Sequence, residues 1–126
     1  MNVLGIGIDA TDIPRVAAIV SRYGDRFLHR VFTKGELAYC TKRRDPTPHL
    51  AGRFAAKEAT FKALGTGWSR DVNWQDVEVF RGAGPPELRL HRGAADRAQA
   101  LGASRLLLTI THSELLAIAQ VVLVGK

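Results

Sequence analysis

The sequence predicts an α+β fold, on the basis of three observations. Residues 3–10, VLGIGIDA, alternate between bulky apolar side chains and glycine, as a β-strand does. Residues 49–65, which include FAAKEATFKAL, are predicted to form a helix that ends at Gly65. Residues 104–113 and 115–124 are two apolar strands with almost nothing between them, so we expect them to pair antiparallel.

Local signals place the helices that follow the first strand. TDIP (11–14) predicts a helix start, with a capping side chain before a proline in the first turn, and this helix is expected to run to about Arg22. Gly24 interrupts it, and a second short helix is expected to follow through Arg30.

The middle of the chain carries one more helix signal and two irregular stretches. Thr33 and Glu36 have the spacing of a capping box, so a short helix is expected over 34–41. RRDPTPHL (43–50) is predicted to be a loop, and WSRDVNW (68–74) is predicted to be irregular.

A hairpin and a helix complete the predicted elements. VEVFR (77–81) and ELRLH (87–91) are predicted strands joined by the turn GAGPP (82–86). RGAADRAQALG (92–102) is predicted to form a helix before the two final strands.

Size and composition indicate an ordinary globular protein. The 126 residues predict a single domain over 1–126, with 46% apolar and 24% charged residues. No apolar run approaches the ~18 residues of a membrane span, and the N-terminus lacks the features of a signal peptide. The single cysteine, Cys40, cannot form an internal disulfide, and no Cys/His metal spacing is present. These observations predict a cytoplasmic protein without membrane association.

The positive charge predicts an acidic partner. The net charge is +6 and the pI is about 10.1. Nucleic acid, a phosphorylated metabolite and an acidic protein all satisfy this expectation, and a basic surface that only aids solubility is the alternative. The basic side chains concentrate in the first half of the chain, at Arg15, Arg22, Arg26, His29, Arg30, Lys42, Arg43, Arg44 and Arg53.

Two carboxylates, Asp9 and Glu58, are candidates for a shared site. Because strand residues alternate faces, Asp9 shares a nearly bare face with the two glycines before it. On the predicted helix, a stripe of alanines lies beside the face that carries Glu58 and Lys62. Close packing of this stripe on the glycines would bring the two acids together, where they repel unless a cation or a proton lies between them. A hard divalent ion such as Mg²⁺ suits such oxygen ligands.

Each of these residues also has an ordinary structural explanation. Asp9 can cap the helix that follows, and Glu58 with Lys62 has the spacing of a surface ion pair worth about 0.2–0.5 kcal/mol. His112, in ITHSE (110–114), could bind phosphate together with the adjacent hydroxyls or simply belong to a turn. Spacing alone leaves these alternatives open.

Three segments together resemble the signature blocks of a known family. They are GIGIDATDIPRV (5–16), AGRFAAKEATFKALGTG (51–67) and ITHSELLAIAQVV (110–122), in the family's order and at its usual spacing. On this pattern the chain resembles the short bacterial 4′-phosphopantetheinyl transferases, the holo-[acyl-carrier-protein] synthases. The resemblance covers nearly the whole chain, and the combination of its motifs is highly specific.

The resemblance implies an activity and an architecture. These enzymes transfer the 4′-phosphopantetheine arm of coenzyme A to a serine of an apo acyl carrier protein and release adenosine 3′,5′-bisphosphate. The implied fold is α+β, with a long helix packed on an antiparallel sheet. The implied assembly is a homotrimer with sites shared between neighbouring subunits. A role in fatty acid biosynthesis follows, although the sequence leaves open whether a fatty-acid or a polyketide carrier protein is preferred.

The resemblance also assigns site residues. Asp9 and Glu58 match the magnesium ligands of the family, and Glu58 and Lys62 are the catalytic candidates. Lys62 matches a lysine that contacts phosphate near the metal. The general base is left open between Glu58 and a water on the metal. The implied coenzyme A contacts are Arg44, Arg53, Lys62, Gly65, Thr66, Gly67 and His112.

The basic surface gains a specific interpretation from the resemblance. Within the coenzyme A contacts, Arg53 and His112, aided by the basic residues at 42–44, match the place where the family holds the adenosine 3′-phosphate. Because acyl carrier proteins are acidic, a further basic set is expected to contact this partner and steer its encounter: Arg15, Arg22 and Arg26. Of these, Arg15 matches a family position most clearly.

One departure and three alternatives complete the sequence interpretation. GAGPPEL (82–88) lacks a lysine that many relatives carry in this turn, which leaves that contact in doubt. A nucleic-acid-binding module is disfavoured because none of its usual motifs is visible. Other phosphate-handling enzymes are disfavoured because neither GxxxxGK[ST] nor GxGxxG follows a strand. The intact set of predicted catalytic residues argues against a non-catalytic scaffold.

Overall fold

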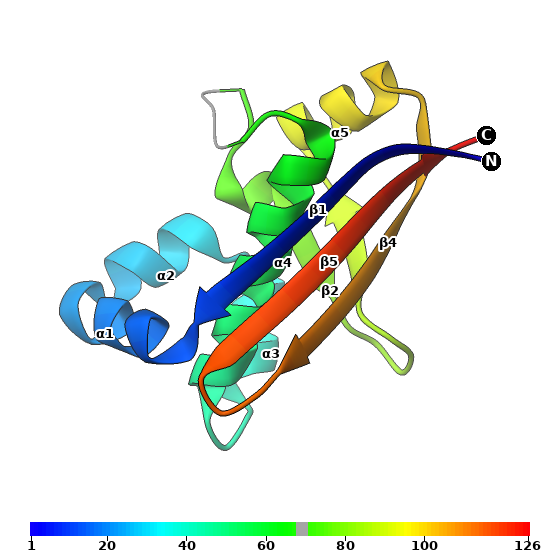
Figure 1. The fold of residues 1–126 in the computed structure, drawn as a ribbon. Coiled ribbons are helices and arrows are strands. Elements are labelled where there is room, and N and C mark those ends of the chain that lie inside the picture. Colours follow the sequence, from blue (N-terminus) through cyan, green and yellow to red (C-terminus); the bar gives the residue numbers. More distant parts are fainter. Residues whose placement is uncertain (68–70) are drawn as a thin grey trace.

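The computed structural model describes residues 1–67 and 71–126. Helices and strands together form a mixed α+β architecture, in which α4 crosses one face of the sheet made by β1, β5 and β4 (Figure 1). The predicted fold class is therefore confirmed. The elements in chain order are β1 (Asn2–Asp12), α1 (Ile13–Tyr23), α2 (Asp25–Val31), α3 (Lys34–Thr41), α4 (Pro46–Leu64), the 3₁₀ helix η1 (Trp74–Asp76), β2 (Val77–Phe80), β3 (Glu87–Leu90), α5 (Arg92–Ala100), β4 (Ala103–His112) and β5 (Leu116–Gly125).

The main sheet is antiparallel, in the order β1-β5-β4. Its central strand is the last in the sequence, and the expected antiparallel pairing of the two C-terminal strands is confirmed. β1 pairs with one side of β5 as far as Asp12↔Leu116, and β4 pairs with the other side as far as His112↔Ala117. The C-terminal ends of β1 and β4 therefore lie at the same end of the sheet. The predicted hairpin is also present, as the separate pair β2–β3.

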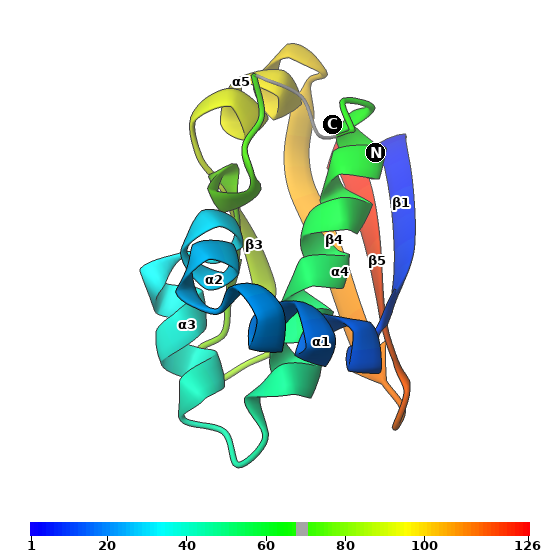
Figure 2. The ribbon, with the colours of Figure 1, turned by 90° about the vertical axis from the view of Figure 1, so that its left-hand side faces the viewer.

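The long helix α4 lies on the sheet (Figure 2), so close to β1 that only glycine fits at positions 5 and 7. A Cβ atom built on Gly7 would lie 1.8 Å from the carbonyl oxygen of Ala59, and one built on Gly5 would lie 2.1 Å from that of Ala63. Glycine in a strand therefore permits this backbone approach. The predicted packing of the alanine stripe on the glycines is confirmed, and it places the middle of α4 beside the end of β1.

The start of α4 corrects the sequence prediction. The helix begins at Pro46, inside the predicted loop 43–50. Asp45 takes the N-cap position, where its carboxylate accepts a hydrogen bond from the backbone N–H of Thr47 at 3.2 Å. The fixed φ of proline suits the first helical turn, so these residues extend the helix instead of forming a loop. The helix ends as predicted at Gly65, whose φ of 73° is left-handed.

The other predicted elements agree with the structure to within two residues at each end. Thr33 and Glu36 form the expected capping box. Within the stretch predicted to be irregular, residues 68–70 lie outside the described residues. Trp74 departs from that prediction because it opens η1, which is capped by a hydrogen bond from the backbone N–H of Asn73 to the Asp76 carboxylate at 3.0 Å.

The face of the sheet opposite α4 carries exposed apolar side chains. Ile6 and Ile8 on β1 are 66% and 58% exposed, and Leu107 on β4 is 40% exposed. Exposed apolar side chains on one face of a sheet are typical of a surface that packs against another protein surface. None of the helices in the described part of the chain has the length and apolarity that crossing a membrane requires.

Candidate active site

A pocket of about 390 Å³ lies where β1 runs into α1 beside the middle of α4. We call it the carboxylate pocket, because Asp9 and Glu58 both line it. Lys62 and Arg15 also line it, so four of the residues singled out in the sequence lie around one cavity. The close packing of α4 on the β1 glycines produces this arrangement, as the sequence predicted.

Hydrogen bonds hold the Asp9 carboxylate at both of its oxygens. The hydroxyl of Thr11 donates to Asp9 Oδ2 at 2.8 Å. Lys62 Nζ lies 3.4 Å from Asp9 Oδ1 and donates to the carbonyl oxygen of Ile8 at 2.8 Å. Because the Lys62 side chain is about half exposed, its ammonium group is accessible to an anionic ligand in the pocket.

The electrostatics of Glu58 indicate that the two carboxylates are close enough to interact. Burial raises the pKa of Glu58, the nearby Asp9 carboxylate raises it further, and the Lys62 ammonium opposes the rise. A cation or a proton between the two acids relieves this unfavourable interaction.

The ligand set of the carboxylate pocket fits Mg²⁺ better than a metal that needs a full protein cage. Within residues 1–67 and 71–126, no group of three or more His, Cys, Asp or Glu side chains is arranged to hold a metal. Two carboxylates, with water and substrate phosphate to complete the coordination, are a pattern that suits Mg²⁺.

The predicted turn Gly65–Thr66–Gly67 lies at the C-terminal end of α4. The backbone N–H of Gly65 donates to Lys62 O at 3.1 Å, and that of Thr66 donates to Phe61 O at 3.2 Å, which closes the helix. The buried Thr66 hydroxyl has no hydrogen-bond partner among the described residues. The turn does not line the carboxylate pocket, but its polar groups lie one helical turn beyond Lys62.

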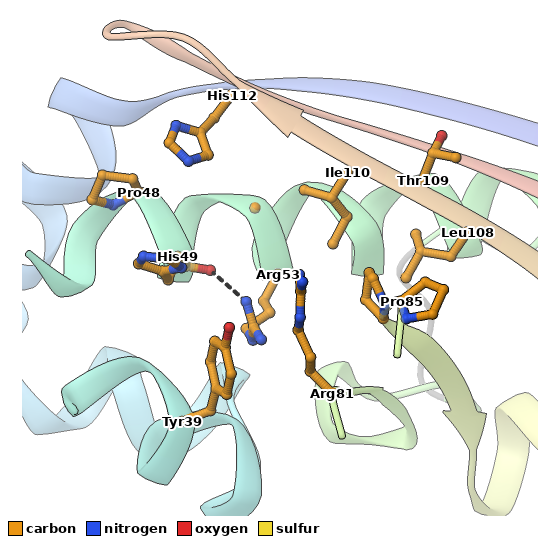
Figure 3. A pocket seen from close by; sticks show the side chains of 12 residues that line it. Tyr39, Pro48, His49, Arg53, Arg81, Pro85, Leu108, Thr109, Ile110 and His112 are labelled. Carbon is orange, nitrogen blue, oxygen red and sulfur yellow. Dashed lines mark hydrogen bonds between the residues drawn. The ribbon is translucent and has the colours of Figure 1, made fainter. Parts of the chain in front are cut away.

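A second pocket, of about 280 Å³, lies between the start of α4, the end of β4 and the β2–β3 turn (Figure 3). We call it the arginine pocket. Arg53 and His112 both line it, so the structure brings together the two residues expected to hold a phosphate. His49 and Arg81 add two further basic side chains, and no acidic residue is among its lining residues.

Arg53 is a buried cation with few polar partners. Its residue is 5% exposed, its Nη1 donates only to His49 O at 3.4 Å, and its Nε has no partner among the described residues. Burial lowers the pKa of His49, and the positive charges of Arg53 and Arg43 lower it further. Together these features describe a site that favours an anion.

Other predicted contacts lie outside both pockets. Arg44 is exposed in the connection between α3 and α4. Neither Arg44 nor Arg43 lines the arginine pocket, although Arg43 stacks on the ring of Tyr39, which does. Arg22 and Arg26 are exposed on α1 and α2. The carboxylate and arginine pockets share no lining residue.

The pattern of the 4′-phosphopantetheinyl transferase superfamily matches residues 5–119. The chain belongs to this superfamily. A holo-[acyl-carrier-protein] synthase of Koribacter versatilis is 45% identical over 122 residues, which cover 96% of this chain and 98% of that relative. The family predicted from the three sequence blocks is therefore confirmed.

Solved structures of this superfamily also match the fold. The holo-[acyl-carrier-protein] synthase from Neisseria meningitidis is 31% identical and covers 98% of this chain and 100% of its own, with a TM-score of 0.90. The synthase from Bacillus anthracis, solved in complex with CoA (3′,5′-ADP), is 34% identical and covers 98% of both chains, with a TM-score of 0.81. The fold implied by the resemblance is confirmed.

Sequence reasoning about this transferase missed several side chains that line the two pockets. The sequence indicates Thr11 only as a helix cap, yet it orients Asp9. Tyr39 and Arg81 reach the arginine pocket from outside the three signature blocks. A weak signal was available for His49, because it lies one helical turn before Arg53. Arg81 places a cation beside the turn that lacks the expected lysine.

Proposed function

We propose that the chain is a holo-[acyl-carrier-protein] synthase. It would transfer the 4′-phosphopantetheine group of coenzyme A to a serine of apo acyl carrier protein and so support fatty acid biosynthesis. The observation that carries this proposal is the gathering of Asp9, Glu58 and Lys62 around one pocket, in a chain that belongs to the superfamily. The complex of the Bacillus anthracis synthase with CoA (3′,5′-ADP) supports the choice of donor.

The transfer exchanges a phosphoanhydride linkage of coenzyme A for a phosphodiester linkage to the carrier serine. The serine Oγ forms a bond to the phosphorus next to pantetheine, and the P–O bond of the pyrophosphate breaks. The serine proton goes to a base, and adenosine 3′,5′-bisphosphate leaves. Glu58, whose raised pKa makes it a better base than an ordinary glutamate, is one candidate for this role, and a water on a bound metal is the other.

Asp9 and Glu58 would hold Mg²⁺. The bound ion would neutralise negative charge on the pyrophosphate. The Thr11 hydroxyl and the Lys62 ammonium would keep the Asp9 carboxylate in place. Lys62, half exposed at the pocket, would contact phosphate oxygens and stabilise the charge that develops on them.

The arginine pocket would receive the adenosine end of coenzyme A. Arg53 and His112 would bind the 3′-phosphate, with Arg43 or Arg44 at the edge of the site and Arg81 in place of the missing turn lysine. Gly65, Thr66 and Gly67 would lie along the coenzyme.

A homotrimer would unite the two pockets. They share no lining residue within one chain, and in a homotrimer a single coenzyme A molecule would span the carboxylate pocket of one subunit and the arginine pocket of its neighbour. The exposed apolar face of the sheet, with Ile6, Ile8 and Leu107, is the surface that would pack between subunits. Sedimentation velocity should give a mass of three chains, and a monomer would contradict this assembly.

A cytoplasmic enzyme that acts on a carrier protein needs a surface for that acidic partner. Arg15 lines the carboxylate pocket, and Arg22 and Arg26 extend the positive charge over α1 and α2. These side chains would steer the carrier serine toward the pocket.

Reversing the charge of Arg15 should separate carrier binding from coenzyme binding. We expect Arg15→Glu to raise the KM for apo carrier protein at least about tenfold, because it replaces attraction by repulsion at the interface. Steady-state kinetics should show a KM for coenzyme A within about twofold of the wild type, a change too small to indicate a lost contact. An equal rise in both KM values would assign Arg15 to the coenzyme site or to folding.

Intact-mass spectrometry tests the proposed function directly. Apo acyl carrier protein incubated with this protein, coenzyme A and Mg²⁺ should gain one phosphopantetheine unit, and EDTA should abolish the gain. The absence of a gain with fatty-acid and polyketide carrier proteins alike would reject the transferase activity.

A further inference from the structure

Arg53 is a buried guanidinium that an aromatic ring supports in place of an acid. Its Cζ lies 4.2 Å from the ring centroid of Tyr39, on the neighbouring helix α3. Within residues 1–67 and 71–126, Arg53 forms no salt bridge. A cation that is buried without a counter-ion is costly unless a ligand supplies the negative charge.

Tyr39 supports a second guanidinium in the same way. Arg43 Cζ lies 4.1 Å from the same ring centroid, and Arg43 follows Tyr39 by one turn at the end of α3. The ring also makes an edge contact with His49, with centroids 6.1 Å apart and planes at 69°. Figure 3 shows the ring of Tyr39 beside the guanidinium of Arg53, at the side of the pocket opposite His112.

A stacked guanidinium keeps its hydrogen-bond donors free. The N–H groups of arginine lie in the plane of the guanidinium, so a ring against its face holds the group without using them. A carboxylate partner would occupy those donors and cancel the charge. The arginine pocket is therefore lined by an anchored cation that forms no salt bridge with the described residues, and no acidic residue is among those that line the pocket.

We propose that Tyr39 is a positioning residue that sets the specificity of this enzyme for the 3′-phosphate of coenzyme A. Its ring holds the guanidinium groups of Arg53 and Arg43 in the orientation that binds this phosphate. This inference rests on the proposed function, because the ligand toward which Tyr39 orients the two arginines is the adenosine end of coenzyme A. The effect is assigned to the ring, since the ring contacts both guanidinium groups.

The kinetic test compares coenzyme A with 3′-dephospho-coenzyme A as donor. Tyr39→Leu should raise the KM for coenzyme A about tenfold, as expected for loss of a desolvated cation–π support, and leave the KM for the dephospho donor within about twofold. Tyr39→Phe keeps the ring and should retain the preference of the wild type. Equal losses with both donors, or a loss in Tyr39→Phe as large as in Tyr39→Leu, would overturn the proposal.

A binding measurement separates this inference from the transferase activity itself. Calorimetry with adenosine 3′,5′-bisphosphate and with 5′-AMP needs no carrier protein and no turnover. Wild type should prefer the bisphosphate, and Tyr39→Leu should lose that preference. If the wild type binds the bisphosphate with this preference but transfers nothing, the proposed function fails and this inference stands. If the wild type shows no preference, the inference fails.

A second variant keeps the test decisive if Tyr39→Leu does not fold. Arg43 is exposed, so Arg43→Gln should fold normally. It should weaken binding of the bisphosphate and leave binding of 5′-AMP unchanged. An unchanged bisphosphate affinity would remove Arg43 from the site and overturn the paired support by Tyr39.

Discussion

Asp9→Ala and Glu58→Ala should each lower the rate of phosphopantetheine transfer by about 10²- to 10³-fold or more, the usual cost of removing electrostatic stabilisation from a reacting centre. Each substitution removes one of the two proposed Mg²⁺ ligands from a pocket that Lys62 and a third carboxylate, that of Asp12, also line. With only one of the two proposed ligands left, the site should hold Mg²⁺ more weakly, because the ion would depend more on phosphate and water for its coordination. Transfer assayed over a range of Mg²⁺ concentrations measures the effect.

Two further measurements distinguish a lost metal site from a lost fold. Calorimetric titration with Mg²⁺ should show weaker binding in both variants, independently of turnover. Asp96→Ala, which removes an exposed carboxylate from α5, is the matched control and should behave like the wild type. Near wild-type turnover in both Asp9→Ala and Glu58→Ala would reject the proposed metal site.

Removing the charge of Glu58 should lower the transfer activity but should not lower the stability of the metal-free protein. Burial and Asp9 raise the pKa of Glu58, so the folded state disfavours the Glu58 carboxylate relative to the unfolded chain. This cost is present at neutral pH and disappears as the pH falls through the raised pKa, where the folded state takes up the proton. Glu58→Gln should therefore retain or increase the free energy of unfolding at neutral pH while it abolishes transfer.

The contact between β1 and α4 could be predicted because its causes are local. Glycines alternate with apolar residues in β1, and alanines recur every four residues in α4. Each pattern is visible within one element, and their complementarity required no knowledge of the connections between them. The meeting of Asp9 and Glu58 followed from that contact, since both acids lie at the same end of it.

The arginine pocket could be predicted only in part, because its walls come from four separate segments. Arg53 and His112 were found through their motifs, but Tyr39 comes from α3 and Arg81 from the end of β2. Nothing in the local sequence specifies how α3 and the β2–β3 hairpin pack around α4. The early start of α4 was also missed. Two prolines near His49 suggested a loop, but the first of them occupies the first helical turn.

Lys57 is the residue whose place in the structure differs most from what the sequence suggests. It interrupts an apolar helix, next to Glu58, and a solvated side chain is the usual fate of lysine. The structure buries it completely, with Nζ 2.8 Å from Glu36 Oε1. Glu36 was predicted only as part of a capping box, 21 positions earlier. A cap and a buried counter-ion are compatible because the carboxylate has two oxygens and several lone pairs.

The ion pair between Lys57 and Glu36 connects α4, α3 and β2. Lys57 Nζ also donates to the carbonyl oxygens of Trp74, at 3.1 Å, and Val77. Glu36 Oε2 accepts from the backbone N–H of Val79 at 2.8 Å. Burial lowers the pKa of Lys57, and the Glu36 carboxylate opposes that change. The pair therefore satisfies backbone groups of η1 and β2 as well as its own charges.

Lys57→Met should lower the free energy of unfolding by about 3–5 kcal/mol, because it leaves the Glu36 carboxylate buried without a counter-ion. Urea denaturation at neutral pH measures this change. A loss below about 1 kcal/mol, the scale of an exposed ion pair, would show that water or another cation reaches Glu36.

The double variant Lys57→Met with Glu36→Leu identifies what the pair contributes. Replacing both members of an isolated buried ion pair by apolar residues is often neutral or stabilising, by about 1–4 kcal/mol. Here the same change strands the backbone N–H of Val79 and the carbonyl oxygens that Lys57 serves, each at a cost of about 1–3 kcal/mol. The double variant should therefore stay well below the wild type in stability. Recovery to the wild-type value would mean that the packing of α3 and β2 around α4 is independent of these hydrogen bonds.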